Sequence, residues 1–111
     1  MLEALWSVEF LSNLQGFGAG VAVLETGRVL GGDSQYTYIG SYSTNPSGIL
    51  NSTVKVSHYF GPPHSIFGAA KEFNLILSGT PAHSSFEMRG HVENNPQLQI
   101  TIRFTRRAEL P

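Results

Sequence analysis

The sequence contains no cysteine and carries little charge. Lys and Arg number 7 and Asp and Glu number 8, and these residues make up only 14% of the chain, where a globular protein ordinarily carries about 25%. Without cysteine there can be no disulfide scaffold, thiolate metal site or cysteine nucleophile. A net charge of −1 also argues against a nucleic-acid-binding module, because such modules are usually strongly basic.

Long apolar runs are absent as well. No run approaches the roughly 20 residues that a membrane-spanning helix requires, and the first ten residues lack the basic and apolar regions of a signal peptide. We therefore expect a cytoplasmic protein. Hydrophobic residues still make up 41% of the 111 residues, which argues against intrinsic disorder. This length predicts a single domain over residues 1–111.

Short alternating segments are the dominant pattern in what is present. The clearest places Leu98, Ile100, Ile102 and Phe104 at every second position among polar residues. Such a period of two is typical of a strand with one buried face and one solvated face. Comparable segments, separated by Gly, Pro, Asn or Asp, cover residues 6–10, 20–25, 28–30, 35–42, 50–60, 72–78 and 86–93.

These segments predict an all-β protein of about eight strands. The connections are mostly too short for parallel crossovers, which need a dozen or more residues, so we expect an antiparallel meander. Eight strands can close into a small lipocalin-like barrel and so remove unpaired edges, while an open two-layer sandwich is the alternative. Only residues 62–71 differ, and they predict a loop or a single helical turn.

Alternating glycines occur at Gly16, Gly18 and Gly20. The spacing does not match the dinucleotide fingerprint, and no helix is expected after it. We interpret these glycines as clearing one face of a strand, which permits sharp curvature or the close approach of another backbone.

A second glycine motif, Gly31-Gly32-Asp33, lies between two predicted strands. It predicts a tight turn in which the glycines adopt positive φ and the Asp33 side chain accepts hydrogen bonds from nearby backbone N–H groups. The functional alternative is a carboxylate at the mouth of a barrel.

No constellation typical of catalysis or metal binding stands out. The histidines (His58, His64, His83 and His91) show no metal-ligand spacing, and zinc needs three or four convergent ligands. We expect no catalytic residues, no metal and no cofactor. A small hydrolase or isomerase that uses His58 with Asp33 or Glu9 is the weakest of the functional hypotheses.

Two sets of residues are candidates for binding. One set shares the apolar face of the predicted strands and would line a barrel interior: Trp6, Val8, Phe10, Val56, His58, Phe73, Leu75, Met88, Ile100 and Ile102. The other set would form a dimer or partner surface if its strand face points outward, because tyrosine suits interfaces: Tyr36, Tyr38, Tyr42, Thr44 and Asn45.

The order of short motifs along residues 5–60 resembles one known family. The motifs are Trp6-Ser7-Val8-Glu9-Phe10, Ser12-Asn13, Gly18-x-Gly20-Val21, Gly27-Arg28-Val29-x-Gly31-Gly32-Asp33, Tyr38-Ile39-Gly40, Gly48-x-Leu50, Val54-x-Val56 and His58-Tyr59. In this order they resemble the GrlR-like negative regulators of type III secretion and similar uncharacterised bacterial proteins.

The resemblance implies a lipocalin-like barrel with an apolar interior, usually a homodimer, that regulates by binding a transcriptional activator protein. The regulators of known role carry an acidic stretch on a loop that contacts the activator. The matching loop here, residues 43–48, contains no acidic residue. Our first functional hypothesis is thus a non-enzymatic, GrlR-like regulator. The alternative is a carrier of a small apolar ligand, with no membrane or nucleic-acid partner in either case.

Overall fold

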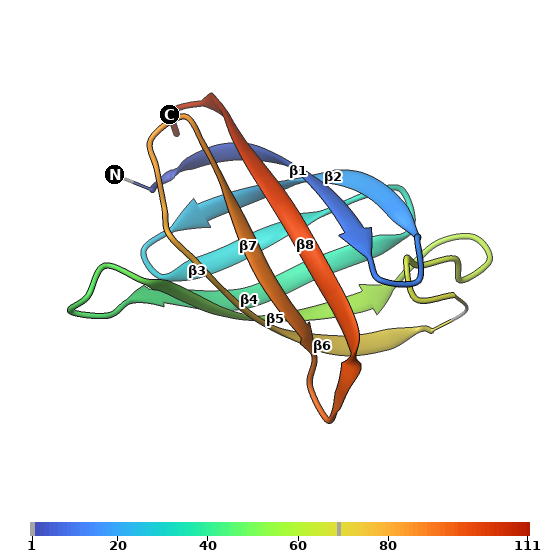
Figure 1. Cartoon of the computed structure of the whole chain (residues 1–111). Coiled ribbons are helices and arrows are strands. Elements are labelled where there is room, and N and C mark those ends of the chain that lie inside the picture. The colour runs from blue at the N-terminus through green and yellow to red at the C-terminus, as the bar shows by residue number, and fades with distance from the viewer. Residues whose placement is uncertain (1, 69) are drawn as a thin grey trace.

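The protein folds into a closed antiparallel β-barrel. A computed structural model describes residues 2–68 and 70–111. Eight strands follow one another around the barrel (Figure 1). They are β1 (Ala4–Ser12), β2 (Phe17–Glu25), β3 (Arg28–Gly32), β4 (Tyr36–Thr44), β5 (Leu50–His58), β6 (Glu72–Gly79), β7 (Ser85–Val92) and β8 (Asn95–Ala108).

Each strand pairs with its neighbours in the sequence, and β1 pairs with β8 to close the sheet. At this seam Val8 lies opposite Phe104, and Phe10 lies opposite Ile102. Closure confirms the predicted eight-stranded barrel and excludes the open sandwich. A closed sheet has no unpaired edge along its length, which explains how a chain with so few charges avoids edge-to-edge association.

The alternation seen in the sequence matches the two faces of the barrel wall. In β8, Ile100, Ile102 and Phe104 are buried and the residues between them face out. Residues 62–71 form no helix in their described part; Ser65 and Gly68 instead exchange backbone hydrogen bonds in a tight turn. The loop interpretation of this segment is therefore the correct one.

The two ends of the barrel differ. At one end, which we call the closed end, the aromatic rings of Trp6, Phe86 and Phe104 fill the interior. Trp6 is fully buried, and its ring lies edge-on to Phe86 at a centroid distance of 5.1 Å. Phe86 stacks on Phe104 at 4.9 Å. The Arg106 guanidinium lies 4.8 Å from the centre of the Trp6 ring and covers it from outside.

The opposite end, which we call the open end, carries the β1–β2, β3–β4, β5–β6 and β7–β8 connections (Figure 1). The β5–β6 connection is the longest of these and folds over the barrel. There Ser12 Oγ donates a hydrogen bond to the Ile66 carbonyl at 2.8 Å. The same connection reaches the β1–β2 turn, since a Cβ added at Gly16 would lie 2.4 Å from the Ile66 carbonyl oxygen.

Candidate ligand-binding cavity

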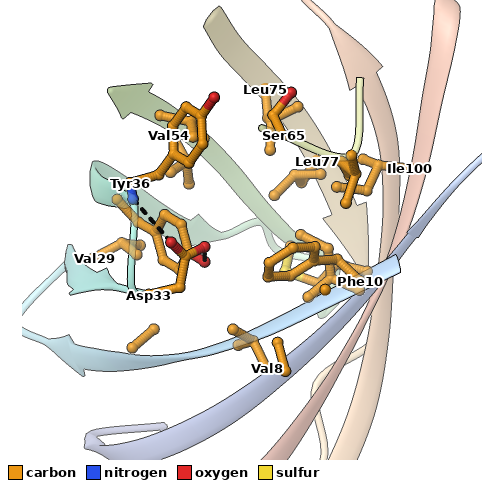
Figure 2. A pocket seen from close by; sticks show the side chains of 18 of the residues that line it. Val8, Phe10, Val29, Asp33, Tyr36, Val54, Ser65, Leu75, Leu77 and Ile100 are labelled. Atoms are coloured by element: carbon orange, nitrogen blue, oxygen red, sulfur yellow. Dashed lines mark hydrogen bonds between the residues drawn. The ribbon is translucent and has the colours of Figure 1, made fainter. Parts of the chain in front are cut away.

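A cavity of about 450 Å³ occupies the barrel between the closed end and the β5–β6 connection. Its volume falls within the range of roughly 300–1,000 Å³ that is typical of small-molecule sites. Figure 2 shows Val8 and Phe10 of β1, Val54 of β5 and Leu75 of β6 pointing into it. The wall is mainly aliphatic and aromatic, so the interior is hollow rather than packed.

The structure places most of the predicted lining residues in this wall. They are Val8, Phe10, Val56, Phe73, Leu75, Met88, Ile100 and Ile102. Trp6 and His58 do not line the cavity, and the prediction is wrong for these two. Trp6 points inward as expected but lies at the filled, closed end. His58 lies at the end of β5, where a ring nitrogen contacts the Gly61 carbonyl oxygen.

The tyrosines of β4 do not form an outer surface. Tyr36 and Tyr38 are buried and Tyr42 is half-buried, and all three line the cavity. The prediction of an outward tyrosine face is therefore wrong. The outward positions of β4 carry Thr37 and Ile39 instead, and Ile39 is 52% exposed.

Glycines on β2 explain why the tyrosine face turns inward. A Cβ added at Gly20 would lie 2.8 Å from the Tyr38 hydroxyl oxygen and 3.2 Å from Asp33 Cβ. A Cβ added at Gly18 would lie 2.4 Å from the Phe10 ring. Gly18 and Gly20 thus clear the inner face of β2, as the sequence predicted, but the space admits rings from β1 and β4 in addition to the predicted approach of another backbone.

The Gly31-Gly32-Asp33 motif behaves partly as predicted. Gly31 and Gly32 belong to β3 and are not among the positive-φ glycines, so the predicted positive-φ turn is wrong at both. Gly31 is needed for a different reason: a Cβ there would lie 2.2 Å from the Val21 carbonyl oxygen of β2. The predicted cap is confirmed, because Asp33 Oδ1 accepts the N–H groups of Gln35 and Tyr36, each at 2.8 Å.

Asp33 also forms the main polar group of the cavity. Its Oδ2 accepts a short hydrogen bond from the Tyr38 hydroxyl, and its backbone carbonyl accepts one from the Tyr59 hydroxyl at 2.7 Å. Burial of the phenol, together with the hydrogen bond to and the charge of Asp33, raises the pKa of Tyr38 above its usual range. The phenol therefore stays protonated and donates to the carboxylate. We call these two side chains the Asp33–Tyr38 pair.

The residues of the weakest hypothesis lie in separate networks. The His58 ring packs edge-on against Tyr36, with centroids 5.5 Å apart, whereas Asp33 binds Tyr38. Glu9 is exposed on the outer wall of β1. Within residues 2–68 and 70–111, no group of three or more His, Asp or Glu side chains is placed to hold a metal ion.

Sequence reasoning did not single out several residues of the wall. These are Leu24, Val29, Leu50, Val54 and Leu77, whereas the three tyrosines of β4 were expected at a partner surface and Asp33 was considered as a carboxylate at the barrel mouth. The alternation itself contained the signal for Leu50, Val54 and Leu77, which share the inward parity of their strands. For the tyrosines, the local pattern allowed either face.

No family model and no curated protein matches the sequence. Among the described residues, no helix is long and apolar enough to cross a lipid bilayer.

Proposed function

We propose that this protein acts in the cytoplasm by binding rather than by catalysis, and that its barrel holds a small apolar ligand. The observation that carries this proposal is the cavity of about 450 Å³ between the aromatic closed end and the β5–β6 connection. Transfer of an apolar molecule from water to such a wall is favourable in proportion to the area removed from water. A packed interior would have left no room for it.

The buried side-chain polar atoms support the same proposal. In the described part of the chain, each buried side-chain nitrogen or oxygen has a hydrogen-bond partner. Ser52, for example, lines the cavity and donates to the Ser41 carbonyl at 2.8 Å. An apolar ligand therefore enters a wall whose polar groups are already satisfied, and it leaves none of them newly unpaired.

Filling the cavity is expected to abolish ligand binding. Val54→Trp adds a large ring to a residue that lines the cavity from β5 (Figure 2). We expect the affinity for the neutral apolar dye Nile red, measured by fluorescence titration, to fall at least about tenfold, since the ring takes the volume that the dye needs.

The matched control is Thr53→Trp, which places the same ring on the exposed face of the same strand. It should leave the affinity for the dye within about twofold, because surface substitutions rarely disturb a barrel interior. Equal dye binding by the two variants would show that the dye binds outside the cavity and would contradict the proposal.

A second candidate function is regulation by protein contact, as the resemblance to the GrlR-like regulators implies. The observation that favours it lies on the outer wall, where Leu5, Val23, Leu30 and Ile39 form one row across β1–β4 through directly paired positions. We call this the apolar row. It contains no charge, and Leu30 and Ile39 are exposed.

The row suits a second copy of the chain. In a twofold dimer the same patch meets itself, so an uncharged apolar row needs no complementary charge to be covered. The loop surface proposed from sequence is less suited to a partner: Thr44 and Asn45 are exposed, but Asn45 Oδ1 already accepts the N–H groups of Ser47 and Ile49, at 3.0 and 2.9 Å.

The dimer makes its own prediction. Sedimentation velocity at micromolar concentration should show a dimer for the native chain and a monomer for Ile39→Lys, because a lysine at the β4 end of the row would be buried in the dimer without a partner. Ser78→Lys, on the exposed face of β6, should remain a dimer. A native chain that sediments as a monomer would exclude this arrangement.

Affinity capture from the source cell then tests whether a transcriptional activator is the further partner.

A further inference from the structure

The charge inside the barrel has one sign. Among the residues that line the cavity in the described chain, Asp33 supplies the one carboxylate and there is no lysine or arginine. His64 is the one side chain of the described wall that can become a cation, and it is exposed at the rim. The two lysines of the chain, Lys55 and Lys71, are both exposed and outside the wall. A ligand in the cavity therefore meets a negative charge and no fixed positive charge.

Four hydroxyls of the wall are already committed as hydrogen-bond donors. The hydroxyls of Tyr36, Tyr38, Ser52 and Ser65 donate their hydrogens to protein oxygens. After that donation a hydroxyl oxygen can only accept. Asp33 accepts three hydrogen bonds, whereas an ionised carboxylate has about four acceptor sites. Asp33 and Tyr38 can therefore accept a further hydrogen bond from a ligand, but they have none left to donate.

The pair packs closely against Gly20 of β2, and the Asp33 side chain still lines the cavity. Any side chain at Gly20 would come against the Tyr38 hydroxyl and the Asp33 side chain. Figure 2 shows the Asp33 carboxylate among the apolar side chains of the wall, with Val29 to one side and Phe10 across the cavity. A polar group of a ligand can therefore approach the carboxylate while its apolar body fills the barrel.

We infer that the ligand of this cavity is a cationic amphiphile: an apolar body that carries a protonated amine or a similar hydrogen-bond donor, bound at the Asp33–Tyr38 pair. This inference rests on the proposed function, since it names the chemical class of the ligand. A charge-assisted hydrogen bond to the carboxylate stabilises an ammonium. An anionic head, such as that of a fatty acid, would be repelled by Asp33.

A series of probes with one common tail tests the inference. Decylamine, decanol and decanoate compete with Nile red at pH 7, where an alkylamine is protonated because its pKa is near that of lysine. We expect decylamine to bind about tenfold more tightly than decanol, which is the size of effect that a charge-assisted hydrogen bond gives. Decanoate should bind more weakly than decanol.

Asp33→Asn isolates the charge. An asparagine Oδ1 can still accept the N–H groups of Gln35 and Tyr36, so the β3–β4 turn keeps its cap. In this variant the decylamine and decanol affinities should agree within about threefold, with decanol unchanged. Tyr38→Phe keeps the carboxylate, and His64→Gln removes the rim imidazole, so both should retain the preference for the amine.

The outcomes separate the two proposals. If decanoate binds as tightly as decylamine, or if Asp33→Asn keeps the preference for the amine, the inference about charge is overturned while the cavity remains a binding site. If Asp33→Asn does not fold, loss of the amine preference in Tyr38→Phe or in His64→Gln would overturn it instead. If none of the three probes displaces Nile red, the proposed function fails, and the inference fails with it.

Discussion

Replacement of Trp6 by alanine is expected to lower the free energy of unfolding by about 3–5 kcal/mol, the usual cost of truncating a large buried aromatic side chain. The Trp6 ring is fully buried and contacts Phe86 and Phe104. Its Nε1 donates a hydrogen bond to the Leu2 carbonyl at 2.9 Å. Alanine would remove these contacts and leave a hole that strands β1, β7 and β8 cannot close.

The measurement is urea unfolding followed by far-ultraviolet circular dichroism, since Trp6 is the only tryptophan and its loss removes the fluorescence signal. Leu11→Ala is the matched control, because Leu11 lies on the same strand and is 51% exposed. It should change the stability by no more than about 0.5 kcal/mol. A cost below about 1.5 kcal/mol for Trp6→Ala would show that the closed end does not support the barrel.

A single methyl group at position 31 is expected to destabilise the barrel by about 3 kcal/mol, at the upper end of overpacking costs. In Gly31→Ala the new Cβ would lie 2.2 Å from the Val21 carbonyl oxygen and 2.7 Å from Ala22 Cα. Both atoms belong to the backbone of β2, so no side-chain rotation relieves the clash. The β2–β3 pairing itself would have to shift.

Gly48→Ala is the matched control, because it adds the same methyl group at a position where glycine is favoured by its backbone conformation and not by a lack of space. Gly48 has a φ of +83° in the β4–β5 hairpin, and a Cβ there would meet nothing within 4 Å. Its cost should be about 1 kcal/mol, from the left-handed backbone conformation alone. Thermal unfolding of the two variants measures the difference. Similar losses would mean that β3 is free to move away from β2.

The strands and their antiparallel order could be predicted because apolar and polar residues alternate within each strand and the connections are short. Apolar residues at every second position, such as Ile100 and Ile102, indicate the buried face of a strand, and the short connections exclude parallel crossovers. The Asp33 cap was predictable too, since it depends only on residues two and three positions further along the chain.

Other features depend on neighbours that the local sequence does not identify. Tyr38 suits either face of a strand, and what fixes its direction is the space left by Gly20, two strands away around the barrel. Trp6 shows the second limit. Alternation tells whether a side chain points inward but not how far along the barrel axis it lies, so a lining residue and a residue of the closed end have the same signature.

Gly31 shows a third limit. A glycine next to another glycine and an aspartate is typical of a turn, yet this one is required by the backbone of β2 across the sheet. A glycine required by a positive φ and a glycine required by a close neighbouring backbone cannot be told apart in a sequence. In both cases a Cβ would be unfavourable, but the cause lies in the folded structure.

The seam between β1 and β8 has a consequence for how the barrel forms. These strands are the first and the last in the chain, so their pairing closes a loop of nearly the whole sequence. Contacts between such distant residues slow folding, since the entropy of loop closure must be lost before they form. During synthesis β8 emerges after the other seven strands of the barrel, and until it does β1 and β7 each present an unpaired edge to other chains. The nascent chain is thus most prone to misassociation in the interval just before β8 is released.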